Sequence, residues 1–107
     1  MVKIVYCITK KPGLSDAEFR RYWKQVHGPI AARIPSVRRY VQSHAIPRGN
    51  EIRPADYDGV AELWFDDIDA LLAAAVSTEA MAAIEDEKNF IDHSRTAFFV
   101  AEEHQIV

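Results

Sequence analysis

The sequence predicts an α+β fold in which one four-stranded antiparallel sheet carries two helices on a single face. Three observations lead to this prediction. The chain has 107 residues, a length that suits a single domain covering residues 1–107. Its hydrophobic patterns follow the order strand, helix, strand, strand, helix, strand. Its strands are apolar on both faces, although two helices cover only one of those faces.

The first strand and the first helix have clear boundaries. Residues Val2 to Thr9 are rich in β-branched and aromatic side chains and stop before Pro12-Gly13, which predicts a strand. A capping box of Ser15 and Glu18 then begins a helix that runs toward Ile34. Its apolar residues recur with the spacing of one helix face: Phe19, Tyr22, Trp23, Val26 and Ile30.

The rest of the chain supplies three more strands and a second helical region. The expected strands are Val37 to Ile46, Tyr57 to Phe65 and Thr96 to Ala101. A polar loop over residues 48–56 is rich in breakers and is a candidate lid over a site. Asp66-Asp67 caps the second helical region, and Ser77 caps its continuation toward Ile91. This order of elements is the ferredoxin-like split βαβ pattern.

The second apolar face of the sheet predicts a homodimer. In the first strand, Ile4 and Tyr6 point to one face while Val5 and Cys7 point to the other. The chain has no further element to cover the second face. A second copy packed sheet to sheet would cover it and bury on the order of 2,000 Å² or more. An uncovered apolar face would instead favour aggregation.

A histidine lies where the first helix breaks, in the sequence His27-Gly28-Pro29. It follows Trp23 by four residues, so it lies at the edge of the apolar helix face. Pro29 has no amide hydrogen to donate, and the helix is therefore expected to loosen or kink here. A partly desolvated histidine beside aromatic rings is suited to move protons near neutral pH. The alternative is a boundary histidine that only caps or packs.

Polar residues alternate along the second strand, where Arg38, Tyr40, Gln42 and His44 share one face. On an otherwise apolar sheet such side chains need partners, water or a ligand. We expect His27, Tyr40 and His44 to converge as catalytic residues on one cavity between helix and sheet. The expected substrate-binding residues around this cavity are Tyr22, Trp23 and Trp64. A polar strand end that reaches solvent is the alternative.

Composition and motifs exclude several classes of function. The formal net charge is −3 with both signs interspersed, so no basic face is available to follow a nucleic acid. The four histidines and the single Cys7 lack metal-ligand spacing, and no glycine-rich phosphate loop is present. No metal or other cofactor is therefore expected. The apolar N-terminal run is too short for a signal peptide or a membrane span. We expect a cytoplasmic protein that does not associate with membranes.

Two charged segments and one carboxylate are interpreted as structural. The run from Glu85 to Lys88 is expected to be a solvated helix face, and Asp92-His93 is expected to cap the end of the second helical region. Glu62, which is surrounded by apolar residues of the third strand, is expected to pair across the sheet with Arg38 or Arg39.

Two blocks of sequence form a wider pattern. The first is Phe19-x-x-Tyr22-Trp23-x-x-x-His27-Gly28-Pro29, followed by Pro35 and Tyr40, and the second runs from Tyr57 to Phe65. Together they resemble the EthD family over nearly the whole chain. The resemblance implies the dimeric α/β-barrel superfamily. Its catalytic relatives include muconolactone-type methylisomerases and fungal dehydratases and decarboxylases, in which a histidine matching His27 and a tyrosine matching Tyr40 lie at the site.

Two classes of function remain open. The first is a cofactor-independent enzyme that isomerises, dehydrates or decarboxylates a small cyclic or aromatic compound by proton transfer. In it, His27 is the acid/base, Tyr40 the oxyanion donor and His44 a second polar group. The second, implied by the resemblance, is a non-catalytic binding or accessory protein for a monooxygenase system that degrades ethers or aromatic xenobiotics. A cofactor-free monooxygenase is a further alternative, and a stress or structural dimer without a ligand is another.

Overall fold

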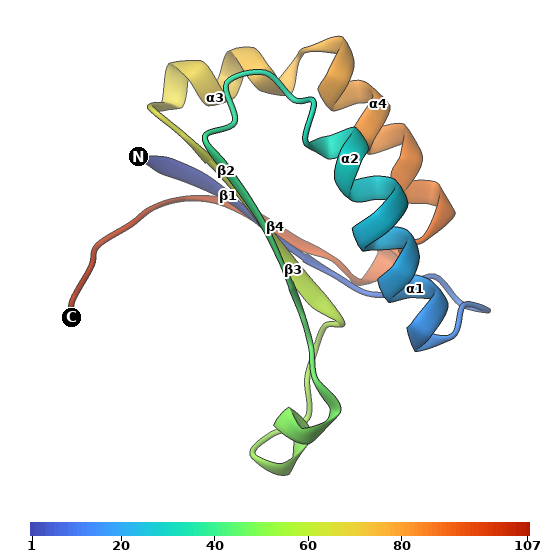
Figure 1. Ribbon diagram of the computed structural model, residues 1–107. Coiled ribbons are helices and arrows are strands. Elements are labelled where there is room, and N and C mark those ends of the chain that lie inside the picture. The colour runs from blue at the N-terminus through green and yellow to red at the C-terminus, as the bar shows by residue number, and fades with distance from the viewer.

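The computed structural model describes residues 1–107 as one sheet with a helix layer on one side (Figure 1). The four strands pair antiparallel in the order β2-β3-β1-β4, which confirms the predicted ferredoxin-like fold. Their bounds are Val2–Ile8 for β1, Arg39–His44 for β2, Gly59–Phe65 for β3 and Ala97–Glu102 for β4. The helices cover one face of the sheet, and the opposite face is open (Figure 1).

The first helical segment is continuous but changes its winding midway. It comprises α1 (Asp16–Tyr22), the π-helical turn η1 (Trp23–His27) and α2 (Gly28–Ala31). Gly28 donates its N–H to the Trp23 carbonyl, five residues back, and Pro29 has no N–H with which to continue the usual ladder. The expected break at Gly28-Pro29 is therefore present as a wider turn that ends at His27.

The second helical region forms α3 (Ile68–Ala75) and α4 (Thr78–Asp86). Asp67 and Ser77 begin these helices by accepting backbone hydrogen bonds from Ala70 and Ala80, as the sequence predicts. The predicted continuation toward Ile91 is wrong. The helix ends at Asp86, and a short 3-10 turn, η3 (Glu87–Asn89), redirects the chain. Two further 3-10 turns, η2 (Pro47–Glu51) and η4 (His93–Arg95), lie in loops.

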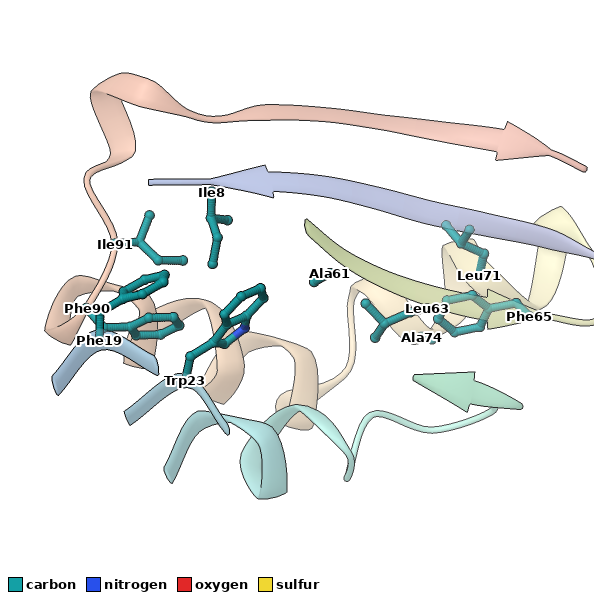
Figure 2. Close-up of a cluster of buried hydrophobic side chains, with 10 residues drawn as sticks. All are labelled: Ile8, Phe19, Trp23, Ala61, Leu63, Phe65, Leu71, Ala74, Phe90 and Ile91. Atoms are coloured by element: carbon teal, nitrogen blue, oxygen red, sulfur yellow. The ribbon is translucent and has the colours of Figure 1, made fainter. Parts of the chain in front are cut away.

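The hydrophobic core lies between the helix layer and the sheet (Figure 2). At one end Phe19, Trp23 and Phe90 gather beside Ile8 and Ile91, and at the other end Leu63 and Phe65 meet Leu71 and Ala74 (Figure 2). Trp23 packs so closely on β3 that a Cβ at Gly59 would lie 2.5 Å from its ring. The chain therefore needs glycine at this position.

The open face of the sheet is mixed rather than uniformly apolar. Trp64 lies on it and is only 6% exposed, because the Arg39 guanidinium stacks 4.6 Å from its ring centroid and Glu103 accepts a hydrogen bond from its Nε1. Glu62 pairs with Lys3 at 2.5 Å. The expected pairing of Glu62 with Arg38 or Arg39 is wrong, because Lys3 reaches Glu62 diagonally from β1 and Arg38 pairs with Asp66.

Three further features of the fold bear on function. The loop that contains residues 48–56 extends beyond the end of the sheet, away from the helices (Figure 1). On the open face, Phe99 of β4 is 53% exposed. None of the helices has the length and apolar character that a bilayer crossing requires.

Replacing Gly59 by Ala should lower the free energy of unfolding by about 1–3 kcal/mol, because the added methyl group overlaps the Trp23 ring and the Ser43 carbonyl, 2.5 and 2.6 Å away. The denaturant midpoint measures this loss. Gly49→Ala is the matched control, since its nearest neighbour lies 3.9 Å away. An equal effect of both substitutions would contradict the close packing of Trp23 on β3.

Candidate active site

A cavity of about 170 Å³ lies between the helix layer and the sheet. Its walls are mostly apolar, and it exists because five of the lining side chains are small: Ala31, Ala61, Ala75, Ala80 and Ala83. An apolar protein cavity of about 150 Å³ is large enough to bind benzene. Four polar side chains also line it, and these are His27, Tyr40, Tyr6 and Glu87.

His27 is the imidazole of this cavity and is only 7% exposed. The π-helical turn brings it to the end of η1, where its Nδ1 lies 2.9 Å from Oδ2 of Asp86 on α4. A carboxylate only accepts hydrogen bonds, so Nδ1 carries the hydrogen when the imidazole is neutral. The lone pair is then on Nε2, for which the structure has no protein partner. His27 is therefore arranged as a proton acceptor in an apolar cavity.

Asp86 is held as a carboxylate by three donors. Tyr22 donates its hydroxyl to Oδ1 at 2.6 Å, Asn89 donates to the same oxygen at 3.0 Å, and His27 donates to Oδ2. Burial opposes the ionised form, but the hydrogen bonds from Tyr22, His27 and Asn89 outweigh it and lower the pKa of Asp86 below its ordinary value. The charge of Asp86 also favours imidazolium at His27 after proton transfer.

The prediction that Glu85 to Lys88 forms a solvated face is wrong for the two central residues. Asp86 faces His27, and Glu87 lines the cavity. One oxygen of Glu87, Oε1, lies 2.9 Å from the Tyr6 hydroxyl and 2.9 Å from His93 Nε2. A signal was present in the sequence, since Glu87 follows the buried Ala80 and Ala83 at helical spacing. Its charged side chain masked that periodicity.

Tyr40 belongs to a relay of hydrogen bonds along β2. Gln42 donates from Nε2 to the Trp23 carbonyl and to the Tyr40 hydroxyl oxygen, both at 2.8 Å. The Trp23 carbonyl only accepts, which fixes the orientation of the amide. Tyr40 therefore receives a hydrogen bond from Gln42 while its own O–H remains available to a ligand. Burial raises the pKa of Tyr40, so the hydroxyl stays protonated at neutral pH.

His44 completes this relay rather than lining the cavity. The fixed amide turns Oε1 of Gln42 toward His44 Nε2, 2.9 Å away, so Nε2 donates to it. The His44 ring also stacks on Trp23 with centroids 4.2 Å apart. Burial, together with the positive charges of Arg20 and Lys24, lowers the pKa of His44 and keeps it neutral at pH 7. His44 and Gln42 thus orient the Tyr40 hydroxyl from the side that faces away from the cavity.

The structure brings together only part of the residue set predicted from the sequence. His27 and Tyr40 share one cavity, while His44 faces an adjoining cleft on the other side of Tyr40. Tyr22 contacts the site through Asp86. Trp23 is a core residue, and Trp64 lies on the opposite face of the sheet, since its pairing partners are Lys3 and Arg39. No residue of the 48–56 loop lines the cavity.

Comparison with known proteins identifies the family of this chain. The model of the EthD domain matches residues 11–94. The chain belongs to the EthD family. Among curated proteins, no sequence matches it. The EthD match includes the helix with His27, the strand with Tyr40 and the carboxylates at the end of α4.

Solved structures share its fold. An ethyl tert-butyl ether D (EthD) family protein from Bacillus halodurans is 21% identical, with a TM-score of 0.79 over 97% of this chain and 99% of its own. A point mutant of SnoaB, a cofactor-independent oxygenase from Streptomyces nogalater, is 17% identical, with a TM-score of 0.69 over 99% and 95%. A dimeric ferredoxin-like protein of unknown function from Bacteroides fragilis is 15% identical, with a TM-score of 0.68 over 95% of each chain.

Replacing Asp86 by Asn should lower the free energy of unfolding by about 1–3 kcal/mol near pH 7, because the charged acceptor shared by Tyr22, His27 and Asn89 is lost. The pKa of Asp86 is lowered in the folded protein, so its stabilising effect is present above the ordinary carboxyl pKa. It is lost as the pH falls through the folded value.

Denaturant titrations over a range of pH test this expectation. The difference between wild type and Asp86→Asn should shrink in acid. Glu85→Gln is the matched control, because Glu85 is exposed and pairs only with Lys88. A pH-independent difference between Asp86→Asn and wild type would contradict an ionised, hydrogen-bonded Asp86.

Proposed function

We propose that this EthD-family protein is a cofactor-independent enzyme that isomerises, dehydrates or decarboxylates a small cyclic or aromatic compound by proton transfer. The observation that carries the proposal is His27, whose Nδ1 is occupied by Asp86 and whose Nε2 is without a protein partner in an apolar cavity. Such a base needs no metal or redox group for proton abstraction.

The chemical step assigns a separate role to each residue. His27 Nε2 takes a proton from a carbon of the ring compound, and the electron pair left behind moves onto a conjugated oxygen. The Tyr40 O–H donates a hydrogen bond to that oxygen as its negative charge develops. Gln42 and His44 keep Tyr40 oriented, and Asp86 stabilises the imidazolium of His27. Return of the proton to another position completes an isomerisation.

The cavity supports a ligand with a single small ring. Its volume of about 170 Å³ and its alanine-rich walls suit a flat, largely apolar molecule. A charged His27 would be costly in this apolar surrounding without Asp86 beside it. The combination of apolar walls with one paired base and one hydroxyl donor is what proton abstraction beside a carbonyl or phenol requires.

A cofactor-free oxygenase is the second candidate, and the fold shared with the oxygenase SnoaB favours it. In that case the same carbanion would react with molecular oxygen rather than with a returning proton. Oxygen consumption during turnover distinguishes the two. An accessory protein, the third candidate, would bind the ring compound without any turnover.

Nitrobenzisoxazole is a probe for the proposed base, because removal of one ring C–H proton forms a nitrile, breaks the N–O bond and releases a coloured phenolate. We expect His27→Ala to slow this reaction by at least about 100-fold, the usual contribution of a positioned base. Tyr40→Phe should slow it about tenfold through loss of one hydrogen bond to the phenolate oxygen.

His104→Ala is the matched control for this assay, since His104 is exposed in the C-terminal segment. It should retain the wild-type rate, and circular dichroism spectra should show that all variants are folded. Equal rates for wild type and His27→Ala would contradict the catalytic proposal and favour a carrier.

We also propose that two copies associate through the open faces of their sheets. The exposed Phe99 lies on this face beside Val5, its pairing partner on β1, because their chain neighbours Phe98 and Tyr6 point to the cavity on the helix side. A fold relative from Bacteroides fragilis is dimeric, which supports association of two copies. A stable interface requires about 800 Å² from each partner, which a four-stranded face can supply.

Phe99→Glu should therefore convert a dimer to a monomer in sedimentation velocity, because a buried unpaired charge is costly in an apolar interface. Leu72→Glu is the control. Leu72 is 57% exposed on the outer side of α3, so its substitution should leave the dimer intact. Monomeric wild-type protein, or dissociation caused equally by both variants, would contradict sheet-to-sheet pairing.

A further inference from the structure

A second, larger cleft adjoins the proposed catalytic cavity. It is open to solvent, has a volume of about 720 Å³, and lies between the first helical segment and β2. We call it the basic cleft because Arg20, Arg21, Lys24 and His44 line it, together with Tyr40 and Gln42, and no carboxylate does. The chain has 16 acidic and 13 basic residues, yet every charged residue that lines this cleft is a cation.

No salt bridge within the protein engages the cations of the basic cleft. Arg20, Arg21 and Lys24 take part in no salt bridge, whereas the two acidic residues of α1 are engaged elsewhere. Asp16 pairs with Lys10 at 2.9 Å, and Glu18 is held in the capping box of the helix. Asp16 still interacts at longer range with Arg20, which lies one helical turn after it. The rest of the positive charge of the cleft is free to act on a ligand.

One of these cations is also held in place. Arg20 is partly buried and donates from its guanidinium to the carbonyl of Ala45 at 3.1 Å, just beyond the end of β2. Its remaining N–H groups have no partner in the protein. An arginine fixed in this way loses less side-chain entropy when it binds a carboxylate than a freely moving one does. Positive potential in the cleft also contributes to the lowered pKa of His44.

The basic cleft and the cavity are separated by a thin wall. Tyr40 lines both spaces. Neighbouring residues of the helical segment divide between them, since His27 and Ala31 line the cavity while Gly28 and Ala32 line the cleft. A molecule with its ring beside His27 and a short arm that passes Tyr40 would bring a terminal group to the cations.

We propose that the basic cleft binds the carboxylate of a cyclic or aromatic acid whose ring occupies the cavity of His27. The proposal rests on the function proposed above and narrows its substrate class to small ring compounds that carry an acidic arm. Arg20 and Lys24 bind the carboxylate, and Tyr40 lies between the carboxylate and the reacting ring. The cations would then set the orientation of the ring toward His27 Nε2.

A matched pair of probes tests the proposal, because phenylacetate and phenethyl alcohol have the same ring and differ in the charge of the arm. Affinities are measured by NMR titration of the full-length protein at low and at physiological ionic strength. We expect phenylacetate to bind about fivefold more tightly at low ionic strength, and salt to reduce this preference. Binding should raise the pKa of His44, because a nearby anion stabilises its charged form.

Lys24→Gln should remove most of the preference, since Lys24 is exposed and its loss leaves the fold intact. The matched control is Arg33→Gln, which removes an exposed cation outside the cleft and should leave the preference unchanged. Equal affinity for the two probes would overturn the proposal, and so would a preference that survives Lys24→Gln.

The outcomes separate this proposal from the catalytic one. If both probes shift the signals of His27 and Tyr40 equally and with equal affinity, the cavity binds rings but the carboxylate site is wrong. If phenylacetate perturbs His44 alone, the cleft binds anions without the ring in the cavity, which also overturns the proposal. If wild type and His27→Ala convert nitrobenzisoxazole at equal rates, the catalytic function is contradicted. The preference of the cleft for phenylacetate over phenethyl alcohol is measured independently of that result.

Discussion

The hydrogen bond between His27 and Asp86 is the interaction on which the site depends. It joins η1 to the end of α4, two segments that are 59 residues apart in the sequence. It fixes the tautomer of the imidazole, and it supplies the negative charge that an imidazolium needs in an apolar cavity. Tyr22 and Asn89 keep Asp86 in place and ionised. Without this bond His27 would be a buried polar group with no partner.

The π-helical turn links the chemistry of the helix to that of the sheet. Because the turn is wider than an α-helical one, the Trp23 carbonyl accepts from Gly28 five residues on, and it also accepts from Gln42 on β2. That second bond orients the Gln42 amide and, through it, Tyr40. This irregular turn therefore positions the proposed base, His27, directly. It positions the proposed oxyanion donor, Tyr40, indirectly through Gln42. Pro29 is the local cause of the wider turn, because it has no backbone N–H to donate to the carbonyl four residues before it.

Alternating or helical spacing predicted the parts of the site that lie on one element. The row of Tyr40, Gln42 and His44 follows from the period of a strand, and the position of His27 follows from the period of a helix. The helix starts at Ser15, Asp67 and Ser77 also followed from local capping chemistry. Residues contributed by a distant element were missed. Asp86 and Glu87 were interpreted as surface charge, because their charged side chains masked the helical spacing that continues from Ala80 and Ala83.

The sequence by itself determined the order of elements, the antiparallel sheet and the two residues, His27 and Tyr40, that share the cavity. It did so because periodicity and capping are local properties of the chain. Only the tertiary structure decided which side of Tyr40 each polar group occupies, that Trp64 lies on the opposite face, and that Asp86 holds His27. Those relations depend on strand register and on how α4 packs over the sheet, and both are set by contacts between residues far apart in the chain.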